Sequence, residues 1–230
     1  MCVSNSENTL SQEEVIKQKL EDLKCQINDL HADLPCLKQC SRLSHLLQEM
    51  CEIREGLDRL EQGLLRTHLN CCISPSTKIP GEVIIAISNL SKKRHGAIIV
   101  IEQEDELDEY IKYVKGGIPL EAALTAPILE NIFYPGSPLH DGAVIIRKSV
   151  IKKASVWLPL APHTSDLEAL NLGSRHRAAL GLSEVSDALL IVVSEEKGWI
   201  SMALRGQLYP NLGTFAFLEK AGKTGDDRKR

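Results

Sequence analysis

The chain has 230 residues, of which 43% are hydrophobic and 25% are charged, and its formal net charge is −4. This length suffices for one full hydrophobic core with a smaller helical module beside it. The acidic balance excludes a global basic field for nucleic acid or an anionic membrane, so any anion recognition must be local. No apolar run approaches the ~20 residues of a membrane span, and no signal peptide opens the chain, which predicts a cytoplasmic protein.

Cysteines are confined to the first third of the chain, which holds all seven of them. An odd number in a chain without a secretion signal predicts reduced thiols. Cys36 and Cys40 have His31 and His45 nearby, but their spacing does not match the usual zinc finger or ribbon. We therefore expect the cysteines to be small buried residues on helices.

Residues 11–69 show the spacing of two helices. Ser11 followed by Glu14 predicts a capping box at the start of the first helix, and Pro35 separates it from the second. Each helix carries a seam of at most about three heptads, which is short for a free coiled coil. The seams are Ile16, Leu20, Leu23, Ile27, Leu30 and Leu34, then Leu43, Leu46, Met50, Ile53, Leu57, Leu60 and Leu64. We interpret residues 1–70 as a packing module, either a hairpin or helices docked on neighbouring subunits.

Residues 71–80 contain prolines and small polar residues and are predicted to be a linker. From residue 81 the pattern changes, and residues 81–222 are predicted to form the catalytic domain, followed by a charged tail over 223–230. Its first elements are a helix near 83–90, a buried strand over 96–101 and a charged surface segment over 104–113. A helix is predicted over 119–132, although Pro127 must break or kink it.

The second half of this domain is predicted to be mainly strands. Two strands at 143–146 and 150–158 join through a turn at 147–149. A short helix follows at 174–182, and a strand pair at 188–193 and 199–204 closes the pattern. This order predicts an α/β (α+β) fold: a mixed sheet flanked by helices and preceded by the two-helix module.

The segment His140-Asp141-Gly142-Ala143 stands directly before one of these strands. A carboxylate there lies at a strand edge, and the glycine allows a ligand to approach the backbone closely. Asp-Gly is also a favoured turn dipeptide, so a plain turn remains the alternative.

The segment Gly173-Ser174-Arg175-His176-Arg177 opens the short helix. Gly173 allows a tight entry and Ser174 can cap the helix, whose positive end favours an anion. Arginine adds donors that suit phosphate. Arg175 and Arg177 lie about 200° apart on a regular helix, so we expect Arg175 to face phosphate and Arg177 to reach around or brace the fold. His176 could donate to phosphate, bind metal or pack. Surface arginines on an amphipathic helix are the alternative for the whole segment.

Ser194-Glu195-Glu196 ends an apolar strand. Paired carboxylates at a strand end can hold the divalent ion that a nucleotide triphosphate needs. A solvated hairpin turn is the alternative, above all for Glu196.

Together these segments resemble the catalytic domain of the diadenylate cyclases, the family that makes cyclic di-AMP. The matching segments follow the family order over about residues 80–206: Gly96–Ile99, Pro138–Ala143, Leu158–Leu160, Gly173–Glu184, Ser186–Ala188 and Ile191–Glu196. Two positions depart from the family pattern, Ser174 in place of the commoner threonine and Pro127 within a usually regular helix. Residues 1–70 are similar to the helical pair of the soluble class from spore-forming bacilli, where such helices are implicated in oligomer assembly and in restraining activity.

The resemblance implies that two ATP molecules are joined, with release of two pyrophosphates. It assigns catalysis to Asp141, Arg175 and His176, and metal binding (Mg²⁺ or Mn²⁺) to Asp141, Glu195 and Glu196. It assigns ATP binding to Gly142, Ala143, Leu158, Ser174, Arg175, Arg177, Ser194 and Glu195.

Because one subunit binds one ATP, the resemblance further implies a homo-oligomer that contains face-to-face pairs of subunits. A hexamer is one assembly that would contain such pairs. Nucleic acid and membrane are not expected as partners. Two other classes stay open on the residues alone: a nucleotide-binding sensor without catalysis, and a scaffold whose helices recruit a partner.

Overall fold

The computed structural model describes residues 6–33, 40–72, 79–104, 107, 116–161 and 173–213. These residues belong to two compact units, one within Met1–Thr67 and one within His68–Arg230. Predictions for the tail over 223–230, for most of the segment 104–113 and for the chain around Pro35 lie outside the described residues. Within the described residues, no helix combines the length and the apolar character needed to cross a bilayer.

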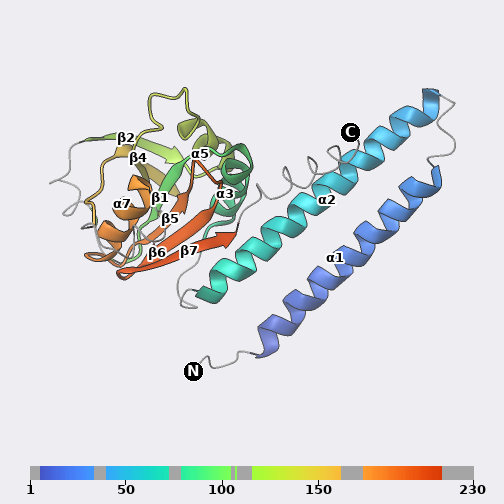
Figure 1. The fold of residues 1–230 in the computed structure, drawn as a ribbon, viewed down its shortest axis with the longest axis horizontal. Helices are drawn as coiled ribbons and strands as arrows, with labels where there is room; N and C mark the ends of the chain where they lie inside the picture. Colours follow the sequence, from blue (N-terminus) through green and yellow to red (C-terminus); the bar gives the residue numbers. More distant parts are fainter. Residues whose placement is uncertain are drawn as a thin grey trace, which may run out of the picture. The chain divides into compact units, whose positions relative to one another are not determined.

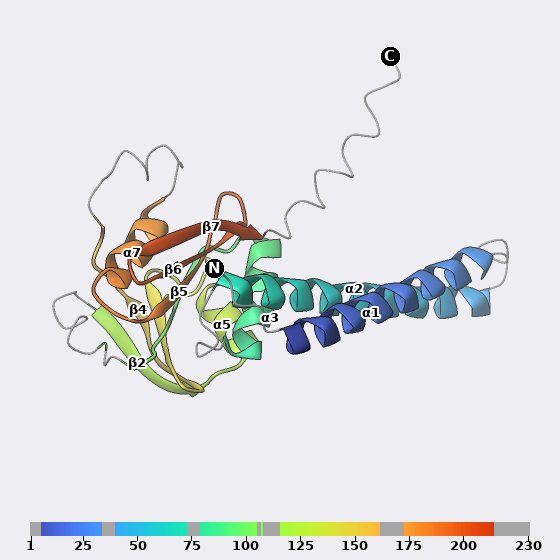
Figure 2. The ribbon, with the colours of Figure 1, turned by 90° about the horizontal axis from the view of Figure 1, so that it is seen from below.

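The first unit consists of helix α1 (Ser6–Asp33) and most of helix α2 (Cys40–Cys72), whose last residues belong to the second unit. The two helices lie side by side in both views (Figures 1 and 2). α1 begins five residues before the capping box predicted at Ser11, and α2 continues to Cys72, so the first two residues of the predicted linker are helical. Gly56 lets the helices approach closely, because a Cβ there would stand 2.8 Å from Cδ2 of Leu23.

Only part of each predicted seam is covered by this pairing. Leu23, Leu46 and Leu60 are buried, whereas other members of the seams are exposed: Leu20, Ile27, Met50, Leu57 and Leu64. The two helices therefore bury one register of each heptad and leave a second apolar stripe uncovered. Cys25 and Cys51 are exposed free thiols, so the expectation that the cysteines are buried is wrong for these two.

The second unit is built on a seven-stranded mixed sheet in the order β2-β4-β3-β1-β5-β6-β7. The strands are β1 (Ala97–Ile101), β2 (Gly116–Ala123), β3 (Ala143–Arg147), β4 (Val150–Val156), β5 (Leu189–Val193), β6 (Ile200–Leu204) and β7 (Gln207–Gly213). β1 pairs with β3 in parallel (Ile99 opposite Val144) and with β5 antiparallel (Ile99 opposite Ile191), and the other pairs are antiparallel. The α/β (α+β) class and the hairpin pairs β3–β4 and β5–β6 are confirmed.

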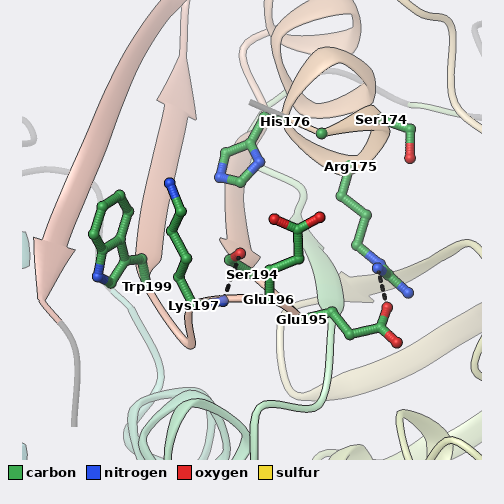
Figure 3. A pocket seen from close by; sticks show the side chains of 9 residues that line it. Ser174, Arg175, His176, Ser194, Glu195, Glu196, Lys197 and Trp199 are labelled. Carbon is green, nitrogen blue, oxygen red and sulfur yellow. Dashed lines mark hydrogen bonds and ion pairs between the residues drawn. The ribbon is translucent and has the colours of Figure 1, made fainter. Parts of the chain in front are cut away.

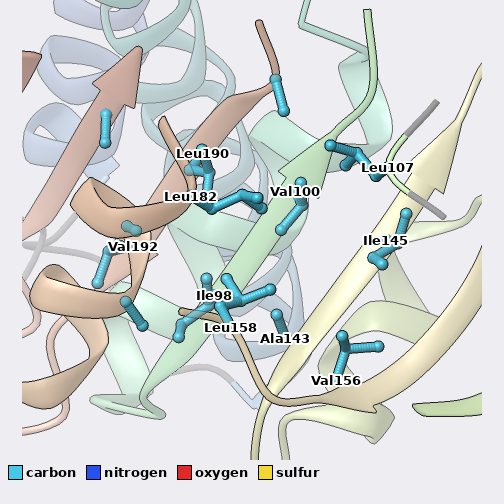
Figure 4. Close-up of a cluster of buried hydrophobic side chains, with 14 residues drawn as sticks. Ile98, Val100, Leu107, Ala143, Ile145, Val156, Leu158, Leu182, Leu190 and Val192 are labelled. Atoms are coloured by element: carbon cyan, nitrogen blue, oxygen red, sulfur yellow. The ribbon is translucent and has the colours of Figure 1, made fainter. Parts of the chain in front are cut away.

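Helices α3 (Gly81–Lys93), α5 (Ala126–Ile132) and α7 (Ser174–Ser183) flank this sheet (Figure 1). Every residue of β1 and β5 is buried, as expected for central strands covered on both faces. One core cluster joins α7 to the sheet through Ala179 and Leu182, which meet side chains such as Ile98 and Leu190 (Figure 4). The strands next to the predicted functional segments thus pack against one continuous hydrophobic core.

The predicted helix over 119–132 is wrong in its first half, because Gly116–Ala123 is the edge strand β2. α5 begins only at Ala126, where the Thr125 side chain accepts a hydrogen bond from the Ile128 N–H. Pro127 lies in the first turn of α5, where a missing N–H costs nothing. Pro127 therefore starts this helix instead of kinking it.

Candidate active site

A cleft of about 580 Å³ opens between the start of α7 and the turn that joins β5 to β6. It is lined by Gly173, Ser174, Arg175, His176, Ser194, Glu195, Glu196, Lys197 and Trp199 (Figure 3). Two of the three predicted segments, 20 residues apart in sequence, thus face each other across one hollow. The sheet makes this possible because α7 packs over β5 and β6.

The helix start in this cleft lacks a side-chain cap. Gly173 is the N-cap residue and no side chain bonds to the first turn, so the prediction that Ser174 caps the helix is wrong. The first N–H groups of a helix have no partner within the helix and carry its positive end. The N–H of His176 donates to the Gly173 carbonyl over 3.1 Å, so the N–H groups of Ser174 and Arg175 are the ones that have no acceptor in the helix and can face an anion.

Arg175 is positioned by contacts on two sides. Its Nη1 lies 2.8 Å from Oε2 of Glu195, and its guanidinium lies against Gly96, where a Cβ would come within 2.6 Å of Cζ. Glu195 is 60% exposed, and ion pairs at such positions are weak. A phosphate can therefore displace Glu195, while Gly96 leaves the space that the guanidinium needs.

His176 lines the cleft but its ring is bound to the protein. The side chain is 6% exposed, and Nε2 lies 3.1 Å from the hydroxyl of Ser201 on β6. Burial, followed by the charges of Lys197 and Arg175, lowers the pKa of His176 to about 4. The imidazole is neutral at pH 7, so it contributes a hydrogen bond and shape, and no positive charge, to the cleft.

The buried neutral His176 predicts that this unit loses stability in mild acid. Its pKa is about 4 in the fold, against 6.5 for a histidine free of such surroundings, so the unfolded chain binds the proton first as the pH falls below 6.5. The free energy of unfolding should then drop by about 3 kcal/mol between pH 6.5 and 4 from this residue. Urea unfolding followed by tryptophan emission measures it, because Trp157 and Trp199 both lie in this unit. His176→Gln, which cannot titrate, should show a smaller fall in the free energy of unfolding with pH. Parallel pH profiles for wild type and His176→Gln would contradict a lowered pKa at His176.

The turn after β5 is held by a dense set of bonds. The N–H of Ser194 donates to the Trp199 carbonyl, that of Gly198 donates to the Ser194 carbonyl, and that of Lys197 donates to the Ser194 hydroxyl. From α3, the Ser91 hydroxyl donates to the Gly198 carbonyl over 2.5 Å. Lys197 and Trp199 were not singled out from the sequence. Their position directly after Glu195-Glu196 in a turn was the available signal.

Asp141, Gly142, Ala143 and Leu158 lie at the β3–β4 side of the sheet and do not line this cleft. Gly142 has φ +105°, and a Cβ there would lie 2.8 Å from the Ser155 carbonyl carbon, so only glycine fits beside β4. Asp141 is exposed directly before it. The alternative that Asp141-Gly142 forms a turn therefore describes the local backbone, and this turn presents the Asp141 carboxylate to solvent.

Arg177 is not among the residues that line the cleft, and it braces the segment after β4. Its Nη2 donates to the Ala161 carbonyl over 3.2 Å, and its own carbonyl accepts from the Ala161 N–H over 3.0 Å. Gly181, one turn further on, meets the same segment, because a Cβ there would stand 2.4 Å from the Pro159 carbonyl oxygen. The expectation that one arginine braces the fold describes Arg177.

The metal set Asp141, Glu195 and Glu196 does not assemble within the described part of one chain, where no group of three or more His, Cys, Asp or Glu is placed to hold a metal. β3 and β5 are separated by β1, about 10 Å at the usual strand spacing. The Glu196 carboxylate is directed into the cleft (Figure 3). One or two carboxylates together with substrate phosphates are the usual ligands of Mg²⁺, so Glu196 with Glu195 fits such an ion once a triphosphate is bound.

Comparisons with known proteins agree on one family. Residues 84–208 match the family model described as DisA bacterial checkpoint controller nucleotide-binding. The chain is 46% identical to the diadenylate cyclase CdaS of Bacillus thuringiensis over 71% of this chain and 79% of that protein. It is 38% identical to the cyclic di-AMP synthase CdaS of Bacillus subtilis over 85% of this chain and 87% of that protein.

A crystal structure of DacA from Staphylococcus aureus matches 70% of this chain and 95% of that chain, with 34% identity and a TM-score of 0.52. The matched family model spans β1 to β6, the cleft and the β3–β4 edge, and ends at the start of β7. The chain therefore belongs to the diadenylate cyclase family.

Proposed function

We propose that this protein is a diadenylate cyclase that condenses two ATP molecules into cyclic di-AMP and releases two pyrophosphates. The main support for this proposal is the cleft in which the uncapped start of α7, Arg175 and the carboxylates of Glu195 and Glu196 converge. Such a site offers backbone donors, a guanidinium and metal-binding oxygens to a triphosphate. The cytoplasm, where ATP is abundant, is the compartment we assign.

The reaction forms one P–O bond and breaks another, twice over. The 3′-oxygen of each nucleotide bonds to the α-phosphorus of the other, and the bond from that phosphorus to the bridging oxygen of the β-phosphate breaks. Each 3′-hydroxyl loses a proton, for which the Asp141 carboxylate is the acceptor we assign. Catalysis in such transfers rests on positioning and on stabilising charge at the phosphate.

Each remaining residue then has a defined task at the phosphates or the base. Ser174 and the first N–H groups of α7 bind phosphate oxygens, and Arg175 leaves Glu195 to contact the triphosphate. Leu158, Gly142 and Ala143 line the nucleoside end, and Ser194 touches the triphosphate region. Glu195 and Glu196 would hold Mg²⁺ or Mn²⁺, which neutralises phosphate charge when bound. His176 positions the helix start through Ser201.

Two facing subunits complete the reaction centre in this proposal. Asp141 lies outside the lining of the phosphate cleft, so the Asp141 carboxylate and the phosphate-binding groups of one chain would contact different ends of a bound nucleotide. A two-fold pair sets the 3′-end of one ATP against the α-phosphate of the other. The need for such pairs is consistent with regulation through assembly.

The function is tested by product analysis of the full chain. Purified protein is incubated with ATP or with GTP, in the presence of Mg²⁺ or Mn²⁺, and products are identified by mass spectrometry while light scattering reports the oligomer mass. We expect ATP to yield one cyclic di-AMP for every two pyrophosphates released. A protein that binds ATP yet makes no cyclic product with either metal, in any oligomeric state, would be a sensor and would overturn the proposal.

The exposed stripe of the helical hairpin suggests how activity is restrained. Leu20 and Ile27 on α1, with Met50 and Leu57 on α2, stay exposed after the hairpin has formed, and we assign a second copy of this chain as their cover. Through these contacts the helices hold the catalytic units in an arrangement that limits face-to-face pairing.

Ile27→Glu should therefore lower the oligomer mass and raise the specific activity severalfold. Gln26→Glu is the matched control, because it adds the same charge at an exposed neighbouring position of α1 without removing an apolar side chain. Light scattering and initial rates at equal protein concentration measure both effects. Equal masses and rates for the two variants would contradict the role of the stripe.

A further inference from the structure

Lys197 is the one cleft residue whose charge the proposed roles do not use. It stands in the turn between β5 and β6, opposite Arg175 across the hollow, with Glu196 between them (Figure 3). In this part of the chain its ammonium lies over the ring of Trp199, 4.3 Å from the ring centre. The cleft thus holds two cations on opposite walls, and only Arg175 is bound to a carboxylate there.

The backbone at Lys197 is held by hydrogen bonds, whereas the ammonium at the end of its side chain contacts only the ring of Trp199 among the interactions described for it. The backbone is fixed by the Ser194 hydroxyl, the Ser194 carbonyl and the Ser91 hydroxyl, as described above. The four-carbon stem beyond this anchor carries three rotatable donors. A cation–π contact at a partly exposed site is weaker than a charge-assisted hydrogen bond to phosphate. An entering phosphate can therefore replace Trp199 as the interaction partner of the Lys197 ammonium.

The order of the strands indicates which phosphate of a bound nucleotide would lie nearest Lys197. Asp141 and Leu158, at the nucleoside end, belong to the β3–β4 side of the sheet, Arg175 lies against Gly96 at the start of β1, and Lys197 follows β5. A nucleotide that lies across these strands has its α-phosphate near Arg175 and its outer phosphates near Lys197. The charge of Lys197 also reaches His176 at the start of α7, whose pKa it helps to lower.

We propose that Lys197 binds the β- and γ-phosphates of ATP and the pyrophosphate that leaves, and that Trp199 holds the side chain when the cleft is empty. This inference rests on the proposed function and adds a phosphate-binding residue to it. The reaction itself is unchanged: Lys197 donates hydrogen bonds to the oxygens that gain charge as the α–β bond breaks, and no proton is transferred.

The test compares ligands that carry or lack the outer phosphates, using the full chain with Lys197→Met. The KM for ATP and the inhibition constant of inorganic pyrophosphate should both rise about tenfold, the loss expected for one hydrogen bond to a charged group. The affinity for AMP should stay within about twofold, because AMP does not reach the turn. Lys197→Arg should restore most of the pyrophosphate affinity. Lys148→Met, which removes the same charge from the exposed β3–β4 turn, is the matched control.

Binding has a readout that does not depend on activity. Trp157→Phe leaves Trp199 as the sole tryptophan, and pyrophosphate should change its emission in this background but not when Lys197→Met is added. Unchanged ATP and pyrophosphate affinities in Lys197→Met, or an equal loss for AMP, would overturn the inference while leaving the cyclase intact. A wild-type chain that bound neither ATP nor pyrophosphate would overturn the proposed function and this inference with it.

Discussion

Asp141→Asn reduces the formation of cyclic di-AMP by about a thousandfold or more, within the range for loss of a general base. The substitution keeps the shape of the side chain but removes the negative charge that accepts the 3′-hydroxyl proton. Asp141 is exposed beside Gly142, so the fold should tolerate the change. ATP affinity should stay within about threefold, because the triphosphate cleft is lined by other residues. Initial rates from product chromatography and ATP binding by calorimetry separate the two quantities.

Glu104→Gln provides the control for charge. It also removes one carboxylate, from an exposed side chain outside the cleft, and should leave both rate and affinity unchanged. Asp141→Glu keeps the carboxylate but moves it by one methylene, so it should retain more activity than Asp141→Asn. Substantial synthesis by Asp141→Asn, or equal losses in both Asp141 variants, would remove the proton-accepting role of this carboxylate.

Gly181→Ala is expected to disrupt both the fold and the nucleotide site. A Cβ at Gly181 would stand 2.4 Å from the Pro159 oxygen and 2.6 Å from the Ala161 nitrogen. These are backbone atoms, so α7 or the segment after β4 must move. The free energy of unfolding should fall by about 3 kcal/mol or more, at the upper end for overpacking. The same movement displaces Leu158 and the start of α7 relative to each other, so the KM for ATP should rise as well.

Gly81→Ala is the matched control for this glycine. It lies in α3 of the same unit, and nothing stands within 4 Å of a Cβ there, so the variant should be as stable as wild type or slightly more so. Urea unfolding of both variants by tryptophan emission gives the comparison. If Gly181→Ala unfolded at the wild-type urea concentration with an unchanged KM, the close approach of α7 would carry no energetic weight.

Local patterns predicted most elements of the catalytic unit because burial on both faces imposes apolar runs of strand length. β1, β3, β5 and β6 all belong to this class. The edge strand β2 was mistaken for a helix because its residues are mostly exposed and lack an apolar alternation. Its pairing with β4, which defines it as a strand, is contributed by residues some 30 positions later in the chain. β7, at the other edge, was missed because Pro210 and Asn211 interrupt its short apolar pattern.

The sequence alone predicted the family, the order of the functional segments and the presence of a separate helical pair. It also predicted that Arg175 and Arg177 would have different tasks, because helix periodicity alone sets them on different faces. The three-dimensional fold shows which groups meet: Arg175 with Glu195 and Gly96, His176 with Ser201, and Lys197 with Trp199. It also set Asp141 apart from the carboxylates after β5, since β1 lies between their strands. Periodicity is a property of neighbours in the chain, whereas these contacts depend on strand order and on glycines that let backbones approach.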